Sequence, residues 1–461
     1  MADAEVDEFP LLHQRATIRV SLENGIDLQG PWRAGQEFGE ILSVLKKMIE
    51  DHPPTAQHLH LSHVAANKLR LVNLNFSLID TSVLEALEVL SASRLWSRVH
   101  IVWCSGNIPT SLLRNTRRLE IYGGGPHWQN SSRPLWEALG TMMLQEVLPC
   151  PLRVLRVRSR FDQGSMGFLT SGLGSPQCSL DELHFTSEFV DAESAMTLAK
   201  GLRTNRSIRR LTFLSCEFYD EITTGQILLA LQNHPTLNTL EVQDNNCLAM
   251  SALSALVESS TCPLETLNLY HPAQIMQGAQ VPRVEAQSLS LALQHNTSLK
   301  HLILASNGLD AAAIASLAEA LKVNTTLQKL DLTGNAIDDD GIETLAAVLP
   351  EMKGLKELLL SNNDFGGRGA RALTEGMKTN VICQSIVTFN KFYASKQLEF
   401  YLHLNQAGRR ILRHENVNSV PLSLWPLLLS RINLRSDWDK SEMASSIYGL
   451  LLEGGHQQLF D

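Results

Sequence analysis

Three consecutive segments decide the fold, because they align over 28 residues without a gap: NTSLKHLILASNGLDAAAIASLAEALKV (296–323), NTTLQKLDLTGNAIDDDGIETLAAVLPE (324–351) and MKGLKELLLSNNDFGGRGARALTEGMKT (352–379). Each contains leucine-x-x-leucine-x-leucine-x-x-asparagine-x-apolar, beginning at Leu299, Leu327 and Leu355. A fixed period of this length indicates an array of structural repeats, in which each unit is one supersecondary element.

The apolar spacing within one unit changes from two residues to three or four. Leu302 and Leu304 alternate as in a short strand, whereas Ile314, Leu317 and Leu321 recur as on one face of a helix. Neither element can bury its apolar side alone. Stacked units therefore predict a parallel sheet on one side, helices on the other and a continuous core between them.

The asparagines of the pattern have structural roles. Asn307 and its equivalents are suited to bonding backbone groups in the turn after the strand. The Asn-Thr pairs before the strands, at Asn296 and Asn324, suit the end of a helix and the turn that follows. Their Asn-x-Ser/Thr sequons are thus explained by the repeat before glycosylation is invoked.

These segments resemble leucine-rich repeats of the ribonuclease-inhibitor-like class. The resemblance implies an α/β leucine-rich-repeat solenoid, a horseshoe with a parallel β-sheet on its concave face, α-helices on its convex face and a helical C-terminal cap. Immune receptors often join such repeats to an ATPase module, but the Gly-x-x-x-x-Gly-Lys-Ser/Thr loop of that module is missing here.

Weaker copies extend the period towards the N-terminus. Their first positions fall at Leu264, Leu237, Ile208, Leu180 and Leu152, and further back at Thr116, Trp96, Leu69 and Ala56. We therefore expect an N-terminal cap at 1–50, about 12 repeats of about 28 residues at 51–392, and a helical C-terminal cap at 393–461. The N-terminal cap is predicted as a hairpin turning at Asn24-Gly25 and an amphipathic helix over 32–52.

Two intervals exceed the period, and the extra residues fall directly after a strand, at 122–138 and 270–286. Insertions at this place project from one rim of a solenoid, where binding loops are common. Surface loops also lengthen at little thermodynamic cost. Both interpretations stay open.

The C-terminal residues 393–461 no longer follow the period. Their LNQAGRR, VPLSLWPLLL and YGLLLEGG segments resemble the endings of intracellular repeat proteins from diatoms and related algae. The Val-Pro-Leu segment after a leucine-rich helix is also similar to the box by which substrate receptors join cullin ubiquitin ligases. A cap that covers the last repeat is the simpler interpretation.

Composition and motifs narrow the function. A net charge of −9 argues against nucleic acid as the partner. The chain shows no secretory signal, no apolar run of the ~20 residues that a membrane span needs and seven scattered cysteines without a Cys-x-x-Cys pair. We expect a cytoplasmic protein, with the nucleus as the alternative compartment, and neither membrane contact nor a cofactor.

Signals for catalysis or metal binding are weak. His58, His60 and His63 form the best metal candidate, but histidines on an exposed strand are commoner than a metal site. Asp338, at the start of a helix, suits an N-terminal cap. No enzyme activity is expected, and no catalytic, cofactor or metal residue is assigned.

Positions three, five and seven of each unit should face the concave side. The early units carry many arginines and histidines there, whereas residues 216–270 hold seven acidic residues and no lysine or arginine. Segregated charge of this kind steers a partner of opposite pattern. The candidate protein-binding residues are Arg98, His100, Arg118, Tyr122, Arg156, Arg158, Arg210 and Tyr270.

The sequence thus predicts a non-enzymatic scaffold or regulator that binds a protein partner on the concave face. Two alternatives remain. One is a regulator of the leucine-rich-repeat type that activates a GTPase, although the long acidic tail of that family is missing. The other is a cullin-ligase substrate receptor acting through the C-terminal helices. Oligomeric state is left open.

Overall fold

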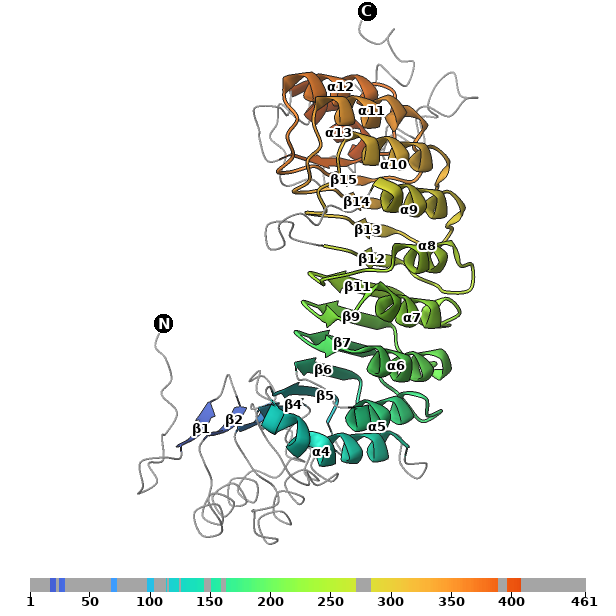
Figure 1. The fold of residues 1–461 in the computed structure, drawn as a ribbon. Helices are drawn as coiled ribbons and strands as arrows, with labels where there is room; N and C mark the ends of the chain where they lie inside the picture. Colours follow the sequence, from blue (N-terminus) through green and yellow to red (C-terminus); the bar gives the residue numbers. More distant parts are fainter. Residues whose placement is uncertain are drawn as a thin grey trace, which may run out of the picture. The chain divides into compact units, whose positions relative to one another are not determined.

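Strands and helices alternate along the chain as the 28-residue period predicts, which confirms the α/β leucine-rich-repeat fold (Figure 1). The structure is a computed structural model, and it describes residues 17–21, 25–29, 68–72, 98–102, 113, 116–123, 126–144, 151–158, 163–270, 283–388 and 396–407.

Contacts between Cα atoms divide the chain into two compact units. The first comprises residues 1–252 and 261–263, and the second comprises 253–260 and 264–461. The division passes through α8 (Met250–Glu258).

The first unit contains a sheet in which neighbouring strands are parallel, except that β1 joins β2 antiparallel. Its strands, in sheet order, are β1 (Thr17–Ser21), β2 (Gly25–Gln29), β3 (Lys68–Val72), β4 (Arg98–Val102), β5 (Arg118–Tyr122), β6 (Val154–Arg158), β7 (Glu182–Thr186), β9 (Arg210–Leu214) and β11 (Thr239–Gln243). Two short strands, β8 (Phe189–Val190) and β10 (Glu217–Phe218), pair beside it. Its helices are α4 (Pro126–Leu144), α5 (Gln163–Leu173), α6 (Ala192–Thr204) and α7 (Glu221–Leu231).

The second unit repeats the scheme with shorter strands. Its parallel strands are β12 (Thr266–Asn268), β13 (His301–Ile303), β14 (Lys329–Asp331), β15 (Glu357–Leu359) and β16 (Ser385–Val387). Its helices are α9 (Arg283–His295), α10 (Ala311–Val323), α11 (Asp339–Val348), α12 (Gly367–Met377) and α13 (Lys396–Ala407), with a 3-10 turn, η3 (Leu349–Glu351), after α11.

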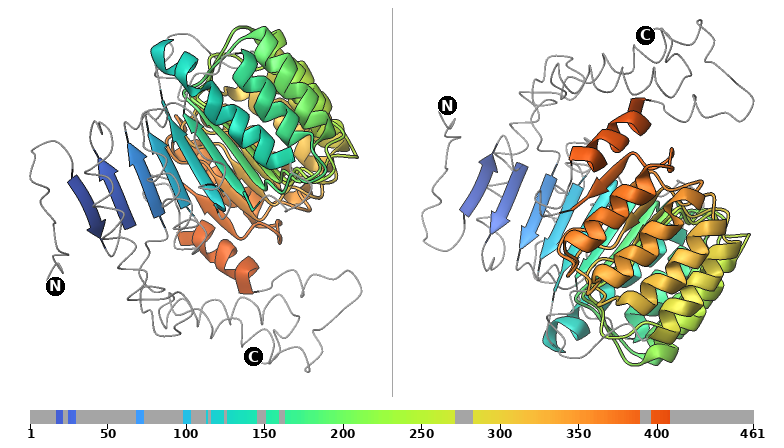
Figure 2. Two further views of the ribbon diagram at one scale, coloured as in Figure 1. Left: turned by 90° about the horizontal axis from the view of Figure 1, so that it is seen from below. Right: turned by 90° about the horizontal axis from the view of Figure 1, so that it is seen from above.

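Within each unit the repeat helices, α4 to α7 in the first and α9 to α12 in the second, line one face of the sheet (Figures 1 and 2). In β6, Leu155 and Val157 are buried against them, while Arg156 and Arg158 are exposed. The alternation follows from the period of two in a strand. The strand face opposite the helices, formed by positions three, five and seven, is termed the open face below.

Buried asparagines tie four of the repeats to the preceding one. Asn324, after α10, donates from Nδ2 to the carbonyls of Leu293 (2.7 Å) and Asn296 (3.1 Å), and its Oδ1 accepts from the backbone of Thr326 and Leu327. Asn205, Asn296 and Asn380 make the same type of bonds. These bonds satisfy carbonyls that the end of a helix leaves unpaired. The structural role predicted for the sequon asparagines Asn296 and Asn324 is therefore confirmed.

The asparagine at position nine of a unit forms a second series of bonds. Asn335 accepts from the backbone of Asn307 and Leu309 and donates to the Leu304 and Leu332 carbonyls. The residue before it, Gly334, has φ of 71°. Position eight has positive φ in other repeats too, at Ser187, Ser215, Asp244, Ser306 and Asn362. A left-handed residue therefore turns the chain out of these strands.

Helix starts also follow the sequence. The carboxylate of Asp338 accepts from the Gly341 backbone at 3.0 Å, which confirms its role as an N-terminal cap. Asp310 and Asp220 cap α10 and α7 in the same way.

Three predictions for the part of the chain before residue 150 can be compared with the structure. At the N-terminal hairpin, β1 and β2 pair antiparallel and β2 continues the sheet to β3, but Gly25, placed in the turn by the sequence, pairs with Ser21 at the start of β2. The placement of Leu69 at position one is wrong: Leu69 stands beside Val99 in the sheet and so occupies position four. The stretch 122–138 is not a loop, because α4 begins at Pro126 and the added residues lengthen this helix. Most of 270–286 lies outside the described residues.

The C-terminal end of the repeats is covered at least by α13. Asn405 is buried and donates to the carbonyls of Asn380 (3.0 Å) and Cys383 (2.8 Å), which lie in the last repeat. Leu398 and Leu404 are buried as well. This packing is expected of a cap, while the Val-Pro-Leu segment, the 32–52 helix and the boundaries of the two caps lie outside what the structure tests.

Candidate functional site

The open face of the first unit brings four of the eight candidate residues into two rows, at positions five and seven, while Arg98, Arg118 and Arg210 stand at position three. In the sheet register, His100, Glu120, Arg156 and His184 are successive neighbours at position five. Tyr122 and Arg158 are neighbours at position seven. Adjacent strands lie ~4.8 Å apart, so side chains from four strands form one continuous surface.

Glu120 organises this surface. Its side chain is only 9% exposed, and it accepts hydrogen bonds from Nε of Arg118 and from the hydroxyl of Tyr122, both at 2.8 Å. Nε2 of His100 lies 3.4 Å from the same carboxylate. The rings of His100 and Tyr122 stack with centroids 6.1 Å apart. One carboxylate therefore holds three of the predicted residues in place.

These contacts shift the protonation of the cluster. Burial alone would raise the pKa of Glu120, but the Tyr122 hydrogen bond, the charge of His100 and the contact with Arg118 together lower it. Burial, followed by the hydrogen bond to Glu120 and its charge, raises the pKa of Tyr122. At neutral pH the carboxylate is thus ionised and the phenol remains a hydrogen-bond donor.

Arg156 and Arg158 differ from this cluster because their side chains are exposed. Among the residues that the structure describes, neither guanidinium takes part in an ion pair or a hydrogen bond. Both lie close enough to Tyr122 to favour its ionised form electrostatically. These two cations therefore remain available to a partner.

The neighbouring strands carry charges that are already engaged. Nε2 of His184 lies 3.1 Å from Glu182, and the pKa of His184 is lowered mainly by burial. Arg210 lies 3.5 Å from Glu241, which also accepts from Thr212 at 3.4 Å. Hydrogen bonds and ion pairs within the face therefore engage these carboxylates.

Two candidates remain. Arg98, on β4, is exposed and is the neighbour of Arg118 in the sheet. Tyr270 belongs to the second unit, is 38% exposed, and its backbone nitrogen donates to Asn268.

Sequence reasoning missed two features of this surface. Glu120 stood in the predicted row but was not chosen, although its place between Arg118 and Tyr122 at alternate positions was a usable signal. The wrong placement of Leu69 also hid two cations: in the sheet, Lys68 stands beside Arg98 and Arg70 beside His100.

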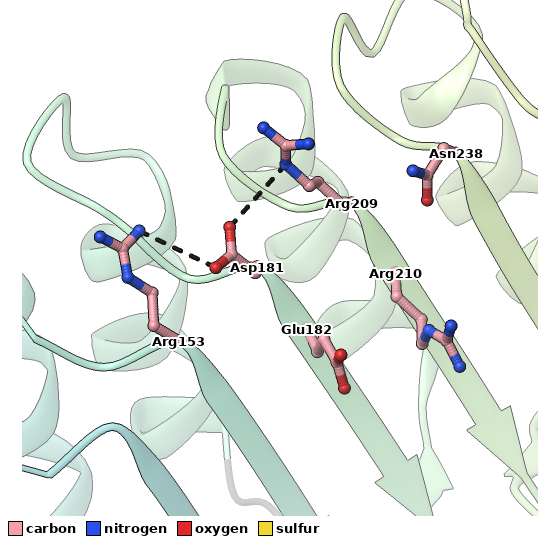
Figure 3. A pocket seen from close by; sticks show the side chains of 6 residues that line it. All are labelled: Arg153, Asp181, Glu182, Arg209, Arg210 and Asn238. Carbon is pink, nitrogen blue, oxygen red and sulfur yellow. Dashed lines mark ion pairs between the residues drawn. The ribbon is translucent and has the colours of Figure 1, made fainter.

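A polar cavity of about 550 Å³ opens at the N-terminal ends of β6, β7, β9 and β11 (Figure 3). Asp181 lies between Arg153 and Arg209, 3.9 Å from each, and Arg153 also donates to the Ser179 carbonyl at 2.9 Å. All three side chains are more than a third exposed. Ion pairs this long and solvated contribute little, so the cavity is a solvated edge of the sheet.

The metal candidate His58, His60 and His63 lies outside the described residues, and no group of metal-ligating side chains occurs within them. No described helix is both long and apolar enough to cross a membrane.

Comparisons with known proteins support the assignment of the 28-residue units as leucine-rich repeats. The family model "Leucine Rich repeat" matches residues 295–318, 323–346 and 355–373. No curated protein matches the chain.

Solved structures show more distant likenesses. The leiomodin-1 actin-binding site 2 is 21% identical over 30% of this chain and 82% of its own, with a TM-score of 0.26. A TLR13–ssRNA13 complex is 15% identical over 64% of this chain and 36% of its own, with a TM-score of 0.37. An internalin from Listeria monocytogenes is 14% identical over 68% of this chain and 72% of its own, with a TM-score of 0.33.

Proposed function

We propose that this leucine-rich-repeat chain is a non-enzymatic scaffold or regulator, and that the open face of its first unit binds a protein partner. The observation that carries the proposal is the pair Arg156 and Arg158, which are exposed and make no ion pair with the described residues. Arginine and tyrosine are the residue types that most often dominate interface energies.

The surroundings of the pair favour binding because they are already ordered. Glu120 fixes Arg118 and Tyr122 by hydrogen bonds, and the His100 ring stacks on Tyr122. Side chains that are held before association lose less rotamer entropy when a partner arrives. A partner thus meets a fixed polar surface beside two exposed cations.

The uneven distribution of charge within the same unit would orient an approaching partner. Residues 216–252 contain five acidic residues and no lysine or arginine, whereas arginines gather on β4 to β6. Such asymmetry orients an approaching partner and raises its association rate more than its final affinity. The described residues add no observation in favour of the GTPase-activating or ubiquitin-ligase alternatives.

Affinity purification tests this proposal. The bait would be the full chain, compared with Arg156→Glu/Arg158→Glu and with Lys200→Glu/Arg203→Glu, a matched charge reversal at exposed positions of α6. We expect the first variant to lose partner proteins that the second retains. Equal recovery by the wild type and the Arg156/Arg158 variant would show that the partner binds elsewhere.

A further inference from the structure

The backbone of β6 restricts how a partner can bind there. It pairs with β5 on one side and with β7 on the other, in parallel register. A partner therefore cannot add a strand at β6, because no edge is open. Recognition at this place must use the outward side chains.

The charges of the open face indicate the chemistry of the partner. The outward positions of β4 to β11 carry five arginines and three glutamates. Glu120 is engaged by Arg118 and Tyr122, Glu182 by His184, and Glu241 by Arg210, Thr212 and Gln243. The carboxylates are thus occupied, and the cations in excess include Arg156 and Arg158. A complementary partner is anionic at this point.

The spacing of the pair indicates the shape of the bound segment. Arg156 and Arg158 are two residues apart on one face of β6, so their Cα atoms are separated by about 6.5 Å. An extended chain that lies along β6 repeats the same distance between its own alternate side chains. Carboxylates at alternate positions can therefore meet both guanidiniums at once.

Fixed groups flank the pair on both sides. Tyr122, held by its bond to Glu120, is the neighbour of Arg158 in the sheet. His184, held near Glu182, is the neighbour of Arg156. The two exposed arginines thus have an ordered polar side chain beside them on each neighbouring strand, which suits an extended chain that lies along β6.

We propose that the partner presents an extended acidic segment, with carboxylates at alternate positions that pair with Arg156 and Arg158 along β6. This inference rests on the proposed function and specifies the partner by its chemistry. The source is an acidic stretch of another protein.

Fluorescence anisotropy with labelled peptides tests the inference on the full chain. One probe alternates aspartate with serine, a second has the same composition with its aspartates consecutive, and a third alternates lysine with serine. We expect the alternating aspartate probe to bind more tightly than the second probe, and about tenfold more weakly to Arg156→Glu/Arg158→Glu, the loss expected from two exposed ion pairs. The lysine probe should gain affinity for that variant.

The control Lys200→Glu/Arg203→Glu should leave the affinity of the alternating aspartate probe unchanged. An equal loss in the control would reduce the effect to general electrostatics and overturn the inference. The same holds if neither acidic probe binds, if spacing makes no difference, or if a single-stranded RNA oligonucleotide of equal charge binds more tightly.

The inference and the proposed function can fail separately. If purified partner depends on Arg156 and Arg158 but is not displaced by the alternating aspartate probe, the acidic segment is wrong and the binding face stands. If partner recovery ignores both arginines, the proposed face is wrong.

Discussion

His234 occupies a position that four other repeats give to asparagine, and replacing it with asparagine should make the protein less sensitive to acid. It lies three residues before Leu237, as Asn324 lies three before Leu327. His234 is 1% exposed, and its Nδ1 accepts from the Leu237 backbone at 3.2 Å. Because Nδ1 accepts, the proton of the neutral ring is on Nε2, which has no hydrogen-bond partner among the described residues.

The magnitude follows from the protonation of this ring. Burial, and then the charge of Arg206, lower the pKa of His234 from 6.5 to about 4. Below pH 6.5 the imidazole of His234 binds a proton in the unfolded chain but stays neutral in the folded chain. The free energy of unfolding therefore falls as the pH falls. A difference of about 2.5 pKa units corresponds to about 3 kcal/mol lost between pH 6.5 and pH 4.

The substitution His234→Asn removes this loss. It also allows the side chain to donate to a carbonyl of the preceding repeat, as Asn205 does to Leu173. Satisfying a buried donor is worth about 1–3 kcal/mol, part of which is offset by the smaller volume of asparagine. At pH 7.5 we expect stability equal to wild type or up to about 2 kcal/mol higher.

Urea unfolding at pH values from 7.5 to 4.5 measures the effect, with hydrogen exchange of residues 221–243 as a local readout because repeats can open one at a time. His301→Asn, at an exposed position of β13, is the control. If wild type and His234→Asn lose stability with the same slope as the pH falls, His234 does not carry the acid sensitivity and the reasoning is refuted.

Three further predictions, made with four substitutions, test the framework by urea unfolding. Glu120→Gln and Tyr122→Phe should each cost about 1 kcal/mol, with a coupling energy of similar size in the double variant; strictly additive effects would contradict their hydrogen bond. Asn324→Leu should cost about 2–4 kcal/mol, because it leaves buried backbone groups unpaired, while the exposed control Asn233→Leu should change little. Gly334→Ala should cost about 1–2 kcal/mol, because φ is positive and the new Cβ would lie 2.7 Å from Oγ of Ser306; an unchanged midpoint would refute this.

The regular part of the fold could be predicted because several independent signals agree in each unit. In the repeats from Leu299 onward, the leucine spacing, the asparagines and the helix caps all indicate the same register, and the strand pairing confirms it. Each signal rests on a local bond or on burial, and each is therefore visible in sequence.

The register before residue 150 could not be predicted in the same way. LRLVNLNFSL, residues 69–78, contains apolar residues at 69, 71, 72 and 74, so two frames three residues apart both fit the pattern. The pairing of β3 with β4 selects the frame with Leu69 at position four. The choice depends on contacts with the neighbouring repeat, which no local pattern encodes.

The candidate site shows a similar limit. Alternation placed Arg118, Tyr122, Arg156 and Arg158 on one face correctly. The burial of Glu120 depends on long side chains from β4 and β5 folding over it, and their rotamers cannot be derived from spacing. In α4, a proline inside a helix is unfavourable, but Pro134 is accommodated in a helix that buries Trp136 and Leu139 in the core.

The buried sequon asparagines have a practical consequence for producing the protein. Asn205, Asn296 and Asn324 are at most 6% exposed and donate from Nδ2, the atom to which an N-linked sugar is attached. A glycan added to the nascent chain would remove that donor and could not fit between repeats. Export through a eukaryotic secretory pathway should therefore yield misfolded protein, and cytosolic or bacterial expression is the appropriate route.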